Sequence, residues 1–257
     1  MVTTSLPPAA RPGVRELWRE LSRSGKKPAP GAPPYSVHIN RPVGRLIAAL
    51  CASMGISANG ATAISAVLTL GGVVLIVFTP GAPLLGVLAG LLLALGYAFD
   101  SADGQLARYA GGGTLFGEWL DHVVDAGKLV LVHGAILLAA WGWTERPSDA
   151  LLLVPIAFAG LASVNFFAMI LNEQLARRAG ATARVAPQAG PRTQLKALLL
   201  LPTDYGVLCL SIVLLGWPTI FFAVYILLAA ALAGSLLVAM PRWGARMARL
   251  DSAVDDV

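Results

Sequence analysis

The chain alternates long apolar runs with short polar joins from about residue 60 onward. Six of these runs have roughly the 20 apolar residues that a helix needs to cross a bilayer. They cover residues 61–79, 83–102, 115–140, 150–171, 195–215 and 219–240. Glycine and proline mark several joins, and Pro202 and Asp204 interrupt the fifth run. The pattern predicts an all-α, polytopic membrane protein with six transmembrane helices.

Two amphipathic segments precede the first apolar run. In each segment, apolar residues recur at helical spacing with arginines nearby: Val14, Leu17, Trp18 and Leu21 in the first, and Val43, Leu46, Ile47 and Leu50 in the second. Such a stripe suits a helix that lies on an anionic membrane surface. The first segment equally fits a short solvated helix in a tail. The second segment favours the interfacial interpretation, because a transmembrane run follows almost at once.

Composition and charge agree with a membrane protein and suggest its orientation. Of the 257 residues, 56% are hydrophobic and 13% charged, and the mean hydropathy is +0.71. Eight Lys/Arg residues precede residue 46, five lie between 177 and 196, and three follow residue 240. Six spans place these segments on one side, which the positive-inside rule makes cytoplasmic. We therefore expect an integral protein of a prokaryotic cell membrane with both termini in the cytoplasm.

The same patterns divide the chain into four parts. We expect a basic, proline-rich cytoplasmic tail at 1–37, an interfacial amphipathic helix at 38–56, a six-helix transmembrane domain at 57–240 and a cytoplasmic tail at 241–257. The basic charges are not interleaved with aromatic residues as in a base-stacking platform. We therefore expect membrane lipids, and no nucleic acid, as partners.

Four aspartates stand out where the second and third apolar runs meet. Asp100 and Asp103 are three residues apart, and Asp121 and Asp125 are four apart, so each pair shares one helix face. The join at Gly111–Gly113 allows the two helices to be antiparallel neighbours, with the carboxylate pairs facing each other. Carboxylates at membrane depth are costly and rarely present without a function.

The chemistry of this block points to bound cations. Carboxylates without a cysteine or histidine cluster favour Mg²⁺, Mn²⁺ or Ca²⁺. Four carboxylates balance two divalent cations, for which we expect Mg²⁺ or Mn²⁺, in a clamp for phosphoryl-type displacement. Arg108 would offer a fork for phosphate, and Gly104 and Gly117 would allow close approach. The alternative is a charge network that only joins two helices.

Three neighbouring residues have simpler interpretations. Lys128, about one turn beyond Asp125, either balances the charge of the site or touches a substrate phosphate, and charge balance is favoured. We expect Glu118 to face water or a headgroup, and His122 to pack or make one hydrogen bond.

The spacing of the block resembles the signature of the CDP-alcohol phosphotransferases. The matching residues are Asp100, Asp103, Gly104, Ala107, Arg108, Gly117, Asp121 and Asp125. The resemblance implies that a CDP-linked alcohol, often CDP-diacylglycerol, is attacked by the hydroxyl of a second alcohol and that CMP leaves. Residues 57–240 would then form the catalytic domain. Family members are typically homodimers.

The resemblance also implies a role for each matched residue. The aspartates Asp100, Asp103, Asp121 and Asp125 would bind the two metals, and Asp125 would also be the general base. The CDP site would be lined by Gly104, Ala107, Arg108 and Gly117. The family often starts its first span with a Pro-Asn-x-x-Thr-like sequence, which here reads Ala58-Asn59-Gly-Ala-Thr62 without the proline. Asn59 and Thr62 would help hold the nucleotide, or Ser57 or Asn59 would simply cap the helix.

The acceptor alcohol is less well defined by the sequence. Basic residues of the loop before the fifth span can bind a phosphorylated acceptor in this family, and here they are Arg177, Arg178, Arg192 and Lys196. Positive-inside charge explains them equally well. Asp204, in an apolar run, would either contact an acceptor hydroxyl or cap a broken helix.

Two other functions use similar residues. Intramembrane prenyltransferases hold a diphosphate with aspartates and Mg²⁺, but they have two separate acidic blocks and more spans. A divalent-cation carrier would be expected to place acids along a path through the membrane, whereas the first and sixth spans have none.

Overall fold

The computed structural model describes residues 12–23, 25, 32–78, 82–143, 147–180 and 200–255. Every regular element in these ranges is helical. The long helices are α3 (Ala58–Val77), α4 (Pro83–Tyr109), α5 (Leu115–Trp141), α6 (Asp149–Arg178) and α9 (Pro218–Asp255). All five are long and apolar enough to cross a membrane, and a shorter apolar helical segment covers Tyr205–Gly216. The predicted all-α, polytopic membrane fold is confirmed.

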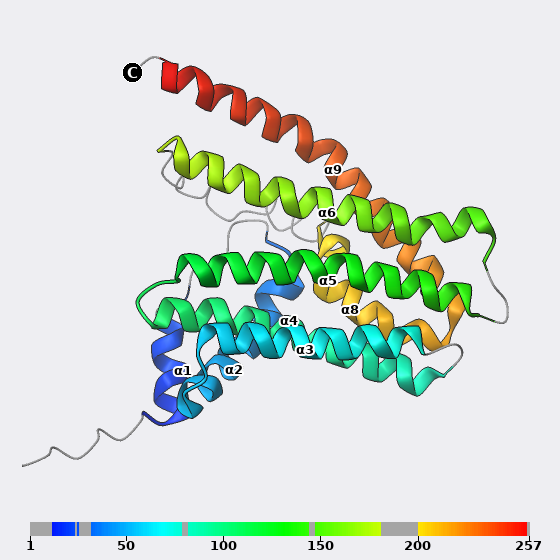
Figure 1. Ribbon diagram of the computed structural model, residues 1–257, viewed down its shortest axis with the longest axis horizontal. Helices are drawn as coiled ribbons and strands as arrows, with labels where there is room; N and C mark the ends of the chain where they lie inside the picture. The colour runs from blue at the N-terminus through cyan, green and yellow to red at the C-terminus, as the bar shows by residue number, and fades with distance from the viewer. Residues whose placement is uncertain are drawn as a thin grey trace, which may run out of the picture.

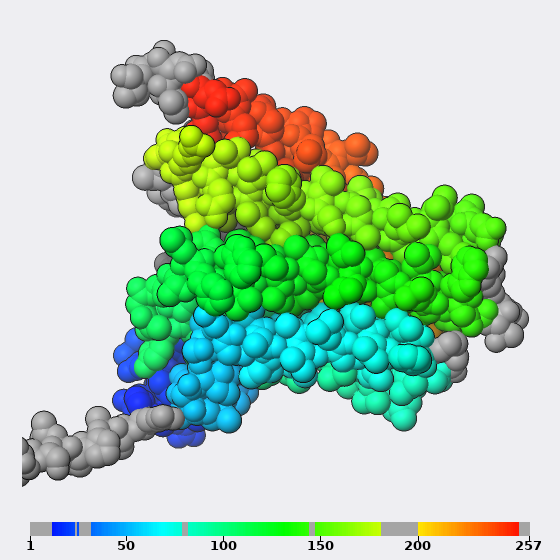
Figure 2. All heavy atoms as spheres, viewed as in Figure 1, coloured from blue at the N-terminus to red at the C-terminus, as the bar shows by residue number. Residues whose placement is uncertain are grey.

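The long helices lie side by side over much of their lengths (Figure 1). The turn between α4 and α5, the C-terminal ends of α6 and α9, and the N-terminal helices α1 (Val14–Arg23) and α2 (Arg41–Met54) share one end of the molecule. Figure 2 shows α3, α5 and α6 packed along their lengths, whereas the last turns of α9 project beyond them. Both described ends of the chain therefore lie at the end that carries the aspartates.

The fifth predicted span differs from the expectation over its described part. Residues 200–204 do not continue a helix: η2 (Leu201–Thr203) is a short 3-10 turn, and α8 (Tyr205–Ile212) and η3 (Val213–Gly216) follow. The prediction of one helix over 195–215 was therefore wrong for 200–204. Pro202 lies in this turn, and Asp204 starts a new helix because its Oδ1 accepts the Gly206 N–H at 2.9 Å.

A close contact between α3 and α4 positions the polar end of both helices. A Cβ on Gly96 of α4 would lie 2.7 Å from Thr69 Oγ1, so the two backbones approach closely only because Gly96 has no side chain. One turn earlier on α3, the Ser65 hydroxyl donates to the Gly96 carbonyl at 2.7 Å. The contact fixes the register of α3 against α4, and one more turn of α3 leads to Thr62.

The second amphipathic segment forms α2, which continues a π-helical turn, η1 (Ser36–Asn40). Large exposed apolar residues recur at helical spacing along both elements: Ile39 of η1, and Val43, Leu46, Leu50 and Met54 of α2. Ile47, which the sequence pattern placed in the same stripe, is instead buried against the bundle. The exposed stripe suits contact with membrane lipid.

The first amphipathic segment forms α1, which is docked on α2. Leu17 and Leu21 are buried against it, and the Tyr109 hydroxyl at the end of α4 donates to Glu20 at 3.0 Å. A solvated helix in a free tail does not describe this arrangement.

Candidate active site

Three of the four aspartates meet between α4 and α5. Asp100 and Asp103 lie on consecutive turns of α4, and Asp121 lies on the facing turn of α5. One carboxylate oxygen from each lies within 4.8 Å of the others. Asp103 is buried, and the other two are partly exposed. Three hard oxygen donors this close, from two helices, fit a single Mg²⁺- or Mn²⁺-type ion.

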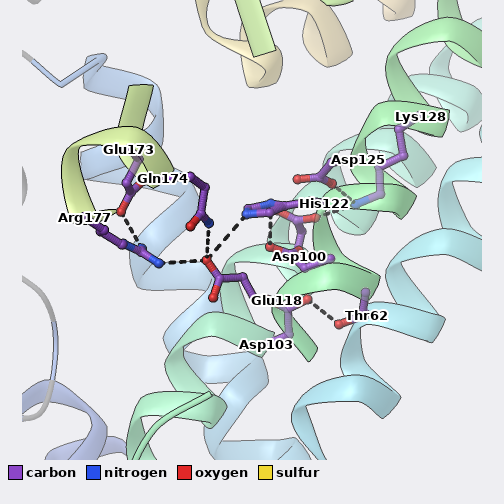
Figure 3. Close-up of polar contacts among 11 residues, drawn as sticks. Thr62, Asp100, Asp103, Glu118, His122, Asp125, Lys128, Glu173, Gln174 and Arg177 are labelled. Atoms are coloured by element: carbon purple, nitrogen blue, oxygen red, sulfur yellow. Dashed lines mark hydrogen bonds and ion pairs between the residues drawn. The ribbon is translucent and has the colours of Figure 1, made fainter. Parts of the chain in front are cut away.

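Asp125, the fourth aspartate, is held by a lysine instead. The Lys128 ammonium donates to Asp125 Oδ1 at 2.8 Å and also contacts Asp100 Oδ1 (Figure 3). The lysine side chain is 8% exposed. The Lys128 ammonium therefore lies between carboxylates of two helices, and this position accommodates positive charge.

Thr62 of α3 fixes the orientation of Asp103. Its hydroxyl lies 2.7 Å from Asp103 Oδ2, to which it donates, and 3.2 Å from the Ala58 carbonyl (Figure 3). Both Thr62 and Asp103 are buried. A hydrogen bond to one carboxylate oxygen leaves the other oxygen available and limits rotation of the group, as in supported metal sites.

A cavity of about 500 Å³ opens beside the aspartates, between the starts of α3 and α5 and the end of α4; we call it the α3-side cavity. Asp103 and Asp121 form part of its wall. All six residues to which the family resemblance gives a possible role in CDP binding also line it: Asn59, Thr62, Gly104, Ala107, Arg108 and Gly117. The structure thus brings these residues from three helices into one space next to the carboxylates.

Helix starts shape this cavity. Ser57 caps α3 by accepting the Gly60 N–H at 3.2 Å, and Thr114 caps α5 by accepting the Gly117 N–H at 3.0 Å. Ser57 rather than Asn59 is therefore the cap, and Asn59 lines the cavity. A Cβ on Gly117 would lie 3.0 Å from Asn59 Oδ1, so glycine allows the two helix starts to approach.

The basic residues predicted to bind an acceptor do not form one group among the described residues. Arg177 lines the α3-side cavity, but its guanidinium donates to Glu118 at 2.9 Å and to Glu173 at 2.6 Å (Figure 3). Gln174 also donates to Glu118, which is exposed to solvent only in part. Arg178 is exposed. Arg192 and Lys196 lie outside the described residues.

Asp204 lies in a separate polar cluster. Besides capping α8, it accepts the Ser36 N–H at 2.9 Å and lies 3.5 Å from the Tyr97 hydroxyl. It does not line the α3-side cavity. It also does not line a smaller pocket that Arg41 and Arg45 form with the aspartates. Its contacts join η1, α4 and α8.

His122 lies between two acids of α5. Its Nδ1 is 3.8 Å from Asp121 Oδ2 and its Nε2 is 4.0 Å from Glu118 Oε1, both beyond hydrogen-bond distance. The ring packs edge-on against Phe166 of α6. Packing, one of the two roles expected for His122, describes this contact.

Sequence reasoning missed the residues of α2 that face the aspartates. Arg41 and Arg45 line a second pocket with Asp100, Asp103 and Asp121, and Gln105 of α4 is buried beside them. The arginines were interpreted only as charges of an interfacial helix. Their spacing of four residues, which places them on one helix face, was the available signal.

The match to known proteins agrees with this geometry. The family model of CDP-alcohol phosphatidyltransferase matches residues 56–239. A phosphatidylinositol phosphate synthase of Corynebacterium glutamicum is 36% identical over 104 residues, which cover 40% of this chain and 44% of that relative. The matched residues include α3–α6, α8 and the part of α9 up to residue 239. The chain therefore belongs to the CDP-alcohol phosphatidyltransferase family.

Proposed function

We propose that the protein transfers a substituted phosphate group from a CDP-alcohol to the hydroxyl of an acceptor alcohol and releases CMP, in phospholipid biosynthesis. CDP-diacylglycerol is the proposed donor. One observation carries the proposal: the cavity lined by the six residues matched to CDP opens directly onto Asp103 and Asp121. A nucleotide in this cavity would place its diphosphate beside the carboxylates.

We propose a separate role for each group of residues at the site. Asp100, Asp103 and Asp121 would hold a divalent cation, and Asp125 is proposed as the fourth ligand of a two-metal site with Mg²⁺ or Mn²⁺. Bound metal would supply Lewis-acid stabilisation of the phosphate oxygens. Arg108 would contact the diphosphate as a planar fork. Asp125 is also the proposed general base that takes the acceptor proton.

The remaining assignments follow from the family and the arrangement of the helices. We propose that the protein is a homodimer in a prokaryotic cell membrane, with the aspartate end and both termini cytoplasmic. The four-part division of the chain at residues 37, 56 and 240 belongs to the same proposal. The similarity to a phosphatidylinositol phosphate synthase supports an acceptor alcohol of the inositol phosphate class.

The test is CMP release by the purified protein in detergent. CDP-diacylglycerol with Mg²⁺ or Mn²⁺ is combined in turn with inositol phosphate, glycerol phosphate, inositol, serine and choline. We expect CMP release with one acceptor, loss of CMP release in EDTA, and a matching phospholipid by mass spectrometry. The matched variant is Asp121→Asn, which removes one proposed metal ligand with little change in side-chain size and should lose turnover. Metal binding without CMP release from any acceptor would contradict the proposal and favour a cation carrier.

A further inference from the structure

Asp204 is a buried carboxylate outside the reaction site, and its two oxygens bond to different parts of the chain. Oδ1 accepts the Gly206 N–H at 2.9 Å, and Oδ2 accepts the Ser36 N–H at 2.9 Å. The residue is 5% exposed. A buried carboxylate is costly unless hydrogen bonds satisfy it, and here each oxygen has its own backbone donor. Asp204 therefore connects two segments that are far apart in the sequence.

Both donors belong to helix starts. Gly206 lies in the first turn of α8, and Ser36 is the first residue of η1, which continues into α2. The first N–H groups of a helix have no acceptor within it, and the helix dipole favours an anion at that end. One carboxylate thus caps two helices. An asparagine could cap only one of them, because its second terminal atom is an N–H donor.

Close packing holds the same two helix starts together. A Cβ on Gly206 would overlap the Tyr35 ring, so Tyr35 lies over the start of α8 only because residue 206 is a glycine. Tyr35 also stacks on Tyr97 of α4, with ring centroids 6.4 Å apart and planes 10° apart. Tyr97 meets the Tyr205 ring edge-on at 5.3 Å. Tyrosines from η1, α4 and α8 therefore pack together beside Asp204.

Packing of α8 on α4 sets the position of this group along α4. A Cβ on Gly90 would lie 3.0 Å from the Cys209 carbonyl oxygen, so the two backbones are close at this point. Gly90 and Tyr97 are seven residues apart and share one face of α4. The Tyr97 hydroxyl lies 3.5 Å from Asp204 Oδ1. We call the following residues the Asp204 cluster: Tyr35, Ser36, Tyr97, Asp204 and Gly206.

The Asp204 cluster is connected to the reaction site at two points. Tyr97 lies one turn before Asp100 on α4. Ser36 begins the helical segment that continues as α2, and a Cβ on Gly44 of α2 would lie 2.7 Å from the Oγ of Ser101, the residue after Asp100. The cluster therefore holds α4 just before the turn that carries Asp100, and it also holds the helix that packs against this turn.

We propose that Asp204 is a positioning residue for the reaction. By capping η1 and α8 together beside Tyr97, it fixes where α4 presents Asp100 to the facing carboxylate of Asp121. Asp204 itself touches neither substrate nor metal. The inference rests on the proposed function and deepens it, because it adds a residue on which the geometry of the metal site depends. Accurate placement matters here, since a shift of about 1 Å at a reacting group can cost 10²-fold in rate.

A purely structural role for Asp204 gives a different expectation. Loss of a merely stabilising contact would lower the melting temperature, but the folded protein would keep the metal affinity and kcat of the parent. Loss of a positioning contact changes both in the folded protein, well below the melting temperature. The KM for CDP-diacylglycerol should change little, because Ser36, Tyr97 and Gly206 do not line the α3-side cavity.

The first experiment compares Asp204→Asn with the matched control Thr203→Val. Asparagine keeps the side-chain size and an oxygen to cap α8, but it loses the second acceptor. Thr203→Val removes only a hydroxyl that donates to the Leu200 carbonyl at 2.8 Å. Mn²⁺ affinity of the full chain in detergent is measured by paramagnetic resonance without substrate, and kcat and KM are measured by CMP release.

We expect Asp204→Asn to lose about tenfold in kcat and to bind Mn²⁺ more weakly by about threefold or more, with the KM for CDP-diacylglycerol within about twofold of the parent value. Thr203→Val should match the parent. A change in kcat or in Mn²⁺ affinity with an unchanged KM supports the proposal. Parent values of both in folded Asp204→Asn, or a change confined to the KM for the donor, would overturn it.

The second experiment uses the unmodified protein and so does not depend on a variant that folds. Coupling between two sites is reciprocal, so contacts that favour metal binding must themselves be stabilised by metal. Hydrogen exchange of the full chain is followed by mass spectrometry with and without Mn²⁺. We expect Mn²⁺ to slow exchange about threefold or more in residues 35–40 and 204–208, and to leave residues 219–230 of α9 unchanged. Slower exchange confined to residues 100–125 would overturn the proposal.

Failure of the proposed function gives a different result from failure of this inference. If the proposed function fails, no acceptor yields CMP with the parent protein, yet Mn²⁺ affinity still falls in Asp204→Asn and Mn²⁺ still slows exchange at both helix starts. If only this inference fails, the parent releases CMP, and Asp204→Asn has the same kcat and Mn²⁺ affinity as Thr203→Val.

Discussion

Lys128 and Arg177 each join two carboxylates, and α5 takes part in both clusters. Lys128 contacts Asp100 of α4 and Asp125 of α5, and its side chain is 8% exposed. Arg177 contacts Glu118 of α5 and Glu173 of α6, and its side chain is 55% exposed. Water and salt screen the second cluster, whereas the first is enclosed by helices. The same pairing of charges is therefore buried within the aspartate cluster in one place and exposed as a surface contact in the other.

The largest effect should come from removing the proposed base in the buried cluster. Asp125→Asn keeps the size and polarity of the side chain but cannot take a proton. We expect CMP release to fall about 10²–10⁴-fold, the usual contribution of a general base. The measurement is a CMP release assay with CDP-diacylglycerol and the accepted alcohol. Activity equal to that of the parent protein would remove Asp125 as the base.

The next effect concerns the stability that Lys128 provides. Lys128→Met leaves Asp100 and Asp125 without their ammonium, and breaking a buried pair in this way should cost about 3 kcal/mol of unfolding free energy in EDTA. Added Mn²⁺ should restore part of the loss, because a divalent cation replaces the missing charge. The measurement is denaturant or thermal unfolding in detergent, with Lys128→Arg as the control that keeps the charge. Unchanged stability in EDTA would show that the ion pair is not structural.

A smaller effect should follow from removing the hydrogen bond that Thr62 donates to Asp103. Thr62→Val removes the hydroxyl that donates to Asp103 Oδ2 and keeps the shape of the side chain. Loss of such a supporting contact typically lowers metal affinity or activity about 10–100-fold. Titration of CMP release with Mn²⁺ should show a higher metal requirement, and excess metal should recover part of the rate. Thr69→Val, two turns further along α3, is the matched control. An unchanged Mn²⁺ requirement would show that Thr62 does not support the site.

The exposed cluster should give the smallest effect. Arg177→Gln removes the guanidinium that bridges Glu118 and Glu173. Exposed ion pairs often contribute nothing measurable, so we expect CMP release within about twofold of the parent value and an unchanged melting temperature. A large rise in the KM for a phosphorylated acceptor would contradict this expectation, and would assign acceptor binding to Arg177.

Most of the fold was readable from the sequence because membrane helices need long apolar runs. The predicted runs at 83–102 and 115–140 lie within α4 and α5. The fifth run was the exception, since a proline and an acid interrupt it. An apolar average does not reveal that Asp204 caps a new helix by binding a backbone N–H. Local hydrogen bonds thus decided a boundary that hydropathy could not.

The site was predictable as a set of residues but not as an arrangement of them. Helical spacing placed Asp100 and Asp103 on one face and indicated that Asp121 would oppose them. It did not show that Lys128 would stand between Asp100 and Asp125, or that Arg177 would be engaged by two glutamates. Side-chain pairing between helices depends on their register, which close packing at residues such as Gly96 sets.

The sequence by itself determined the membrane fold, through the length of its apolar runs, and the residues of the acidic site, through their spacing within single helices. Only the tertiary structure decided which charged side chains line the same pocket. Arg41 and Arg45 precede the aspartates by more than fifty residues, and nothing local relates the two groups. The absence of a side chain on Gly44 lets α2 approach α4, and this contact brings the arginines to the pocket beside the aspartates.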